Sequence, residues 1–251
     1  MITIKQLAKS YGNKPALSDV SMTIRRGEAL ALLGHNGAGK TTTLRLLCGL
    51  LQPSGGRIES GDPCAPPACK TSLGFVPDEP VMFDYLTGNE MVHFVGTLYR
   101  LKRDQLEARA ARYFRTFEMN GARDGLIHGY SRGMRQKTAI IASLIHDPQY
   151  WFMDEPDRAL DPVAMKTLKD LIQQFKAENK AVVISTHRLD VAESVCDRMV
   201  ILNQGTTLFE GGIQELRKTT GLECSTLEEI YVRLLGSSQD KAHRSGVKSN
   251  D

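Results

Sequence analysis

Short apolar runs alternate with amphipathic stretches along most of the chain. Four continuous apolar runs have the length of strands buried in a parallel sheet, at residues 29–33, 73–76, 150–153 and 181–185. Three stretches carry apolar residues at helical spacing, at residues 43–50, 162–178 and 189–196. Strands that alternate with helices in this order predict an α/β fold.

Weaker patterns lie toward both ends of the chain. Shorter or less regular strands are predicted at residues 1–7, 16–25, 57–59, 199–203 and 206–210. The last two flank Gln204 and Gly205, so they are expected to form a hairpin. Two short helices are predicted near residues 213–218 and 226–235. The polar residues 237–251 are expected to form a disordered tail.

A helical block interrupts this alternation in the middle of the chain. Residues 86–101 and 104–119 are predicted to form two helices, with Thr87 and Asp104 as their N-caps. We interpret the whole block, about residues 82–147, as a helical subdomain inserted into the α/β core.

The composition is that of an ordinary globular protein. Of 251 residues, 41% are hydrophobic and 24% charged, which permits one large domain or a domain with an insertion. The formal net charge of +3 comes without a dense basic stripe, so nucleic acid is not an expected partner. The apolar runs are far shorter than the ~20 residues that cross a bilayer. With no signal peptide at the start, the protein is expected to be cytoplasmic.

The five cysteines are scattered, and their odd number fits a reducing compartment. Cys64 and Cys69 flank a proline-rich loop at a spacing found in metal sites. No second Cys or His pair follows, and this favours a plain surface loop.

The candidate chemistry begins after the first apolar run. Residues 34–42 fit the pattern of glycine, four residues, then Gly-Lys-Thr, and they precede a predicted helix. The glycines let backbone amides converge on an anion, and the helix adds the positive end of its dipole. The alternative, a glycine-rich turn that binds nothing, is disfavoured by the strand before and the helix after. The predicted nucleotide-binding residues here are Gly34, His35, Asn36, Gly37, Ala38, Gly39, Lys40, Thr41 and Thr42. Lys40 is expected at the β- and γ-phosphates and Thr41 at Mg²⁺.

Two carboxylates follow the apolar run at residues 150–153. Asp154 and Glu155 would stand at the carboxyl end of a buried strand, where α/β sheets bind ligands. Asp154 is a candidate Mg²⁺ ligand and Glu155 a candidate base for the water beside the γ-phosphate. Two acids in an ordinary turn are the simpler alternative, and the phosphate-binding pattern upstream favours the metal and base.

Three further positions have a functional and a structural interpretation. Tyr11 precedes the phosphate-binding pattern and could stack on a purine base, although aromatics are more often buried. His187 follows the strand at residues 181–185 and is a candidate at the γ-phosphate. Ser131 and Gly133 open a helix beside several basic residues, which suits either an anion site or an ordinary N-cap.

Taken together, these motifs resemble the ATP-binding subunit of an ABC transporter, over about residues 2–235. In that family, residues 34–42 correspond to the Walker A motif and residues 150–155 to the Walker B motif with the catalytic glutamate. Tyr11 lies at the adenine-stacking position. Residues 159–161, including Asp161, resemble the D-loop. Residues 185–187 resemble the segment that carries the switch histidine, here His187.

The sequence departs from the family pattern at four places. Residues 130–136 replace the usual signature with a Tyr-Ser-X-Gly-Met-Arg-Gln form that resembles ABC-2-type exporters. Asp78 fills the Q-loop glutamine position, so the resemblance assigns it the contact to water and Mg²⁺, with Glu79 as the alternative. Ala159 replaces the usual small polar residue or glycine of the D-loop, and Pro156-Asp157-Arg158 replaces the common Pro-Thr before it.

The resemblance implies a fold and a mechanism. The fold is a P-loop NTPase core, a mixed sheet with flanking helices, joined to an N-terminal antiparallel β subdomain and the helical insertion. Two subunits, the same or paralogous, would close head-to-tail on two ATP molecules, placing each γ-phosphate between Lys40 and His187 of one subunit and Ser131 and Gly133 of the other. Glu155 would activate the attacking water. Hydrolysis would power a separate membrane permease, for export, with the subunit held at the inner face of the membrane.

Two other functions stay open at this point. One is an ABC-type ATPase that acts on protein or nucleic-acid assemblies. The other is a regulatory module that binds ATP with low turnover, an interpretation suggested by Asp78 and Ala159.

Overall fold

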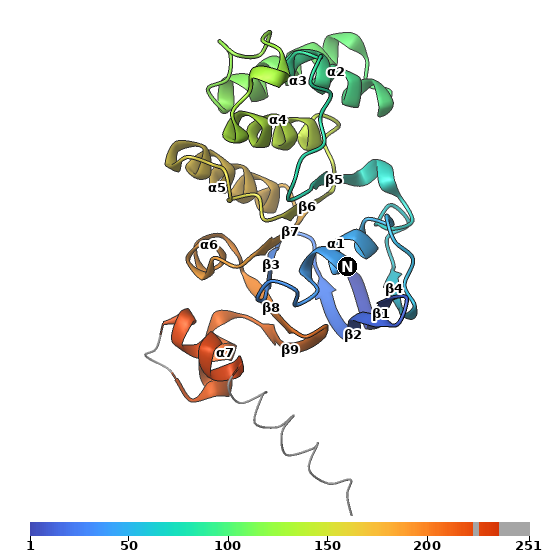
Figure 1. The fold of residues 1–251 in the computed structure, drawn as a ribbon, viewed down its shortest axis with the longest axis vertical. Helices are drawn as coiled ribbons and strands as arrows, with labels where there is room; N and C mark the ends of the chain where they lie inside the picture. Colours follow the sequence, from blue (N-terminus) through green and yellow to red (C-terminus); the bar gives the residue numbers. More distant parts are fainter. Residues whose placement is uncertain (223–225, 236–251) are drawn as a thin grey trace, which may run out of the picture.

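The computed structural model describes residues 1–222 and 226–235. Within those residues nine strands join in one sheet, in the order β4-β1-β2-β9-β8-β3-β7-β6-β5 (Figure 1). The tail predicted at residues 237–251 lies outside the described residues.

The centre of the sheet is parallel, as the continuous apolar runs predict. Its strands are β3 (Ala29–Leu33), β5 (Leu73–Val76), β6 (Tyr150–Asp154), β7 (Ala181–Thr186) and β8 (Arg198–Asn203). β3 pairs with β7 on one side and β8 on the other, and β6 pairs with β7 and β5. All side chains of β3, β6 and β7 are buried. Both faces of these strands are therefore covered, which accounts for their unbroken apolar sequences.

Most pairings of the remaining strands are antiparallel. β1 (Ile2–Tyr11) pairs with both β2 (Lys14–Ile24) and β4 (Gly55–Ser60). β8 and β9 (Thr206–Gly211) form the predicted hairpin about Gln204 and Gly205. A single parallel pair, Asp19 with Thr206, connects β2 to β9. The N-terminal antiparallel strands are thus continuous with the parallel core.

Helices cover the two faces of this curled sheet. α1 (Lys40–Leu47) packs between the N-terminal strands and the parallel core, whereas α5 (Pro162–Ala177) and α6 (Leu189–Val195) lie on the opposite face (Figure 1). α7 (Ile213–Thr220) and a helical stretch at residues 227–235 pack with α6, β3, β8 and β9 through a separate apolar cluster. Short 3₁₀ turns occupy Lys70–Ser72 and Ile127–Gly129. Among the described residues, no helix combines the length and the apolar character that crossing a bilayer requires.

The helices of the central block gather at one end of the molecule (Figure 1). They are α2 (Gly88–Leu98), α3 (Arg103–Thr116) and α4 (Arg132–Leu144). α2 packs on α3 and α4, and α4 also packs on β5. α4 is therefore the element through which this block contacts the sheet.

One of the two predicted helix caps in this block is confirmed and the other is wrong. Thr87 caps α2 in a reciprocal capping box with Glu90. α3 instead starts at Arg103, with Lys102 as an N-cap that makes no side-chain hydrogen bond. Asp104 lies in the first turn, where a carboxylate still interacts favourably with the helix dipole without capping it.

Candidate functional site

The phosphate-binding pattern forms a turn between β3 and α1. Gly37 and Gly39 have φ of 84° and 110°, in the region that favours glycine. A Cβ at Gly39 would also lie 2.4 Å from Leu17 Cδ2 and 3.2 Å from Ala16 O, so a side chain there would displace Leu17. With Gly39 as its N-cap, α1 directs its free amides toward the turn. These features make the turn a cradle for an anion.

Lys40 is held inside this turn. Its side chain is only 5% exposed, and Nζ donates to Gly34 O at 2.7 Å. Nζ also lies 3.5 Å from Glu155 Oε1. The lysine therefore connects the phosphate-binding turn to the acidic end of β6.

Asp154 and Glu155 are fixed by the neighbouring strand. Asp154 is opposite Ser185 in the β6–β7 ladder, and the Ser185 hydroxyl donates to Asp154 Oδ1. The Glu155 amide donates to the backbone oxygen of Ser185 at 3.0 Å and lies 3.2 Å from its Oγ. Glu155 has φ of 47°, an uncommon conformation for a side-chain-bearing residue that the serine helps to hold.

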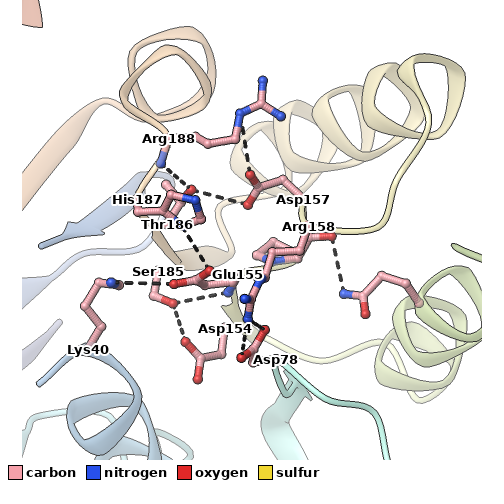
Figure 2. A network of polar contacts seen from close by, with 12 residues as sticks. Lys40, Asp78, Asp154, Glu155, Asp157, Arg158, Ser185, Thr186, His187 and Arg188 are labelled. Atoms are coloured by element: carbon pink, nitrogen blue, oxygen red, sulfur yellow. Dashed lines mark hydrogen bonds and ion pairs between the residues drawn. The ribbon is translucent and has the colours of Figure 1, made fainter. Parts of the chain in front are cut away.

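The Glu155 carboxylate is surrounded by three basic side chains (Figure 2). His187 Nδ1 lies 3.0 Å from Oε2, and Arg158 Nε lies 3.5 Å from the same oxygen. Lys40 approaches the other oxygen. Sequence reasoning placed Lys40, Glu155 and His187 at one end of the sheet, and the structure brings these three together.

A cavity of about 500 Å³ opens beside these groups. Its lining combines the phosphate-binding turn, the end of β1, the start of β2 and both acidic loops: Tyr11, Lys14, Pro15, Ala16, His35, Asn36, Gly37, Gly39, Lys40, Thr41, Thr42, Asp78, Glu155 and Arg158. This volume is within the usual range for small-molecule sites. Tyr11 was expected between two strands but is the last residue of β1, and its side chain is half exposed at the cavity wall.

Sequence reasoning missed Arg158. Its Nη1 lies 2.7 Å from each carboxylate oxygen of Asp78. Asp78, followed by Glu155, raises the pKa of the guanidinium. The available signal was that two departures from the family pattern place an acid at Asp78 and a base at Arg158. Asp78 was predicted as a metal ligand and catalytic residue, and in the structure it engages this arginine.

Ser131, Gly133 and Asp161 are not part of the cavity lining. Ser131 caps α4 by accepting from the Met134 amide at 3.2 Å. A Cβ at Gly133 would lie 2.8 Å from Ala159 O, so α4 starts against the loop that leads into α5. Asp161 caps α5 through the Ala164 amide, which together with Lys137 lowers the pKa of its carboxyl group. Within one chain Ser131 and Asp161 therefore cap helix starts, and Gly133 allows α4 to pack closely on the loop before α5.

Asp157 is a second residue that sequence reasoning did not single out. It is 4% exposed, and burial raises the pKa of its carboxyl group. Thr186 Oγ1 donates to Oδ1 at 3.3 Å, while Oδ2 has no hydrogen bond within the described residues. Arg188 Nε lies 3.8 Å from Oδ2. Asp157 thereby ties the loop after β6 to the loop after β7.

The donor set around the cavity suits Mg²⁺ bound mainly by a ligand. Within the described residues there is no cluster of three or more His, Cys, Asp or Glu side chains that could hold a metal by itself. Thr41 lines the cavity, and the buried Asp154 directly precedes Glu155, which lines it too. Mg²⁺ typically takes one or two protein oxygens and completes its shell with phosphate and water. These residues therefore fit the ion.

A glycine turn before a helix, a buried lysine and an acidic strand end define the P-loop ATPase class. The model of the ABC transporter family matches residues 17–158. The uncharacterized ABC transporter ATP-binding protein YxlF of Bacillus subtilis is 34% identical over 98% of this chain and 82% of its own length. The chain thus belongs to the ABC transporter family and is an ATP-hydrolysing, ATP-binding subunit of that family.

Two solved structures agree with this assignment. One, described as the ATP binding subunit of an ABC transporter, is 32% identical with a TM-score of 0.87, and the match covers 94% of this chain and 99% of that one. The other is a dimeric post-hydrolysis state of the ATP-binding cassette MJ0796 bound to ADP and Pi. It is 25% identical with a TM-score of 0.74, over 85% of this chain and 99% of that one.

Proposed function

We propose that this ATPase drives an exporter through a separate integral membrane permease, with Glu155 as the catalytic base. The contacts of Glu155 with Lys40 and His187 support the catalytic role. The phosphate-binding turn and Lys40 would hold the triphosphate, and Tyr11 would stack on the base. Thr41 and Asp154 would hold Mg²⁺, which supplies positive charge to the phosphates.

The proposed reaction is direct transfer of the γ-phosphoryl group to water. Glu155 accepts a proton from the water as its oxygen attacks phosphorus. The bond between that phosphorus and the bridging oxygen breaks, giving ADP and inorganic phosphate. Lys40 stabilises negative charge that develops on the phosphate oxygens. His187, beside Glu155, fixes the direction of the carboxylate and reaches toward the same phosphate.

A second ATPase subunit completes the proposed site. Ser131 and Gly133 lie outside the cavity of their own chain, at the N-terminus of α4. A helix N-terminus with free amides suits a phosphate anion. In a head-to-tail pair this end of α4 would close over the ATP held by the other subunit. The dimeric state of the MJ0796 cassette supports this arrangement.

An exposed apolar segment is the proposed permease contact. Val81, Phe83 and Tyr85 are 89%, 55% and 91% exposed, respectively. They follow Asp78, and Val81 itself lines a groove of mainly apolar side chains from β5, α2, α4 and adjoining loop residues, including Met82, Met91 and Tyr99. Large exposed apolar residues that cluster in this way mark interaction sites. Because Asp78 lines the ATP cavity, this segment would link hydrolysis to the permease, at the inner face of the membrane.

The test of the permease contact is co-purification from detergent. The tagged chain would be expressed with the membrane protein encoded beside it, and we expect the two to elute as a stoichiometric complex. A variant with Val81→Ser, Phe83→Ser and Tyr85→Ser should lose the complex and keep nucleotide binding. Val163→Ser, which changes a 56%-exposed residue on α5, is the matched control and should keep the complex. Equal recovery of the complex with the triple variant would contradict this docking site.

A further inference from the structure

Arg158 lies in the wall of the ATP cavity although its sequence position gave no such expectation. It is on the turn between β6 and α5, and Asp78 lies just after β5. Both residues line the cavity together with Lys40 and Thr41. The Asp78–Arg158 ion pair therefore forms part of the cavity wall and connects two loops of the site.

Arg158 and Lys40 share one carboxylate. Lys40 Nζ is 3.5 Å from Glu155 Oε1, and Arg158 Nε is 3.5 Å from Glu155 Oε2. The two cations thus face the two oxygens of a single anionic group (Figure 2). A phosphoryl group presents the same kind of oxygens, and the planar guanidinium is well suited to bind them.

The guanidinium has donors beyond those that its protein partners use. Nη1 is engaged by Asp78, and Nε is directed to Glu155. Within residues 1–222 and 226–235, the side-chain hydrogen bonds of Arg158 are made by Nη1 and none by Nη2. The side chain is 53% exposed, so this nitrogen can meet a ligand that enters the cavity.

We propose that Arg158 is a catalytic residue that contacts the terminal phosphate of ATP from within the same chain, and that Asp78 is its positioning residue. Asp78 holds Nη1 and so directs the other guanidinium donors toward the cavity. An arginine at this place stabilises charge on the phosphate oxygens as the bond to ADP breaks. When the Arg158 guanidinium exchanges its contact with Glu155 for one with the phosphate, the glutamate is free to accept the proton of water. The inference rests on the proposed role of Glu155 in ATP hydrolysis.

The test compares hydrolysis with nucleotide affinity in purified full-length protein. Arg158→Gln should lower kcat by about 30-fold or more, a modest value for an arginine that contacts a transferring phosphate. The affinity for a non-hydrolysable triphosphate analogue should fall by about 10-fold, and that for ADP by less than about 3-fold, because ADP lacks the group that the arginine contacts. Asp78→Asn should lower kcat with little change in KM, and Asp78→Glu should restore part of it.

Arg57→Gln is the matched control. The Arg57 side chain is 65% exposed on β4, where it pairs with Glu59. It does not line the cavity, so removing the same charge there should leave kcat and both affinities within about 3-fold of wild type.

Two results would overturn the inference. One is an Arg158→Gln variant with the kcat of the wild type. The other is an equal loss of affinity for ADP and for the triphosphate analogue, which would indicate general attraction of anions. In both cases wild-type hydrolysis that depends on Glu155 would still support the proposed function. Only a wild type that fails to hydrolyse ATP would contradict that function itself.

Discussion

The ring nitrogen Nδ1 of His187 lies 3.0 Å from Oε2 of Glu155, and the two residues come from neighbouring loops after β7 and β6. The histidine side chain is half exposed, whereas the glutamate is 8% exposed. A contact between a buried carboxylate and an accessible imidazole fixes the direction of the acid while leaving the ring able to meet a ligand.

His187→Ala should slow ATP hydrolysis without abolishing ATP binding. Loss of a group that orients the base and contacts the phosphate is expected to lower kcat by about 100-fold. The measurement is steady-state phosphate release together with binding of a fluorescent ATP analogue. His128→Ala, at an exposed position on the 3₁₀ turn before α4, is the control and should behave as wild type. Unchanged kcat in His187→Ala would remove the histidine from the mechanism.

Tyr11→Ala should weaken nucleotide binding with little effect on kcat. Tyr11 is 48% exposed at the cavity wall, with Lys9 Nζ 5.6 Å from its ring centroid. Stacking on a base is worth about 1–3 kcal/mol, so the dissociation constant should rise by roughly 5- to 100-fold. Tyr11→Trp should keep affinity. Tyr85→Ala removes an equally aromatic but distant side chain and should leave affinity unchanged; similar losses in both variants would argue against stacking.

Ser185→Ala should destabilise the fold at the acidic end of β6. The hydroxyl donates to Asp154 and lies 3.2 Å from the Glu155 amide, and all three residues are buried. Removing it takes the hydroxyl donor from the buried Asp154 carboxylate, at a cost of about 1–3 kcal/mol in the free energy of unfolding. Urea unfolding measures this cost. Ser194→Ala removes only a bond to Val191 O within α6, and it should change stability by less than about 0.5 kcal/mol.

The stability of the protein should fall between pH 6.5 and pH 4 because of His146. Burial lowers the pKa of this imidazole to about 4, and its Nε2 lies 3.0 Å from Leu73 O. An unfolded histidine has a pKa of about 6.5, so below that pH the unfolded chain takes up the proton first. The contribution of the neutral His146 to the free energy of unfolding is therefore complete above pH 6.5. It declines as the pH falls toward 4, by about 3 kcal/mol at most.

Urea unfolding at pH 7.5 and pH 5.0 checks this pH dependence. His146→Phe cannot titrate and keeps an aromatic ring against Tyr99, so its stability should fall less between the two pH values. His128→Phe changes an exposed histidine and should keep the wild-type slope. The same slope in all three proteins would exclude His146 as the cause.

Local sequence signals were sufficient for much of the fold and for the centre of the site. The limits of β3 and β5 were predicted to the residue, because buried parallel strands require continuous apolar runs. The phosphate-binding turn was recognisable because its glycines, lysine and threonine must occur at fixed spacing. Glu155 and His187 were predicted as site residues because each comes after a buried strand, and ligands bind at the carboxyl ends of the strands of a parallel sheet.

Other features depended on contacts between distant parts of the chain. The pairing of Asp78 with Arg158 joins residues 80 positions apart, and no local pattern encodes it. Lys102 rather than Asp104 caps α3 because the chain enters that helix one residue before the predicted start. Tyr11 extends β1 because pairing with Lys14 continues the ladder into the turn. The places proposed for Ser131 and Gly133 relative to ATP depend on the proposed second subunit.

The central claim is that Glu155 activates water for a triphosphate held by Lys40, and the most direct test measures hydrolysis and binding in the same variants. Wild type should release phosphate from ATP with Mg²⁺, and Glu155→Gln should lower the rate by about 100-fold or more while it still binds ATP and dimerises in its presence. Lys40→Ala should lose both binding and hydrolysis. Equal rates of phosphate release by wild type and Glu155→Gln would contradict the account.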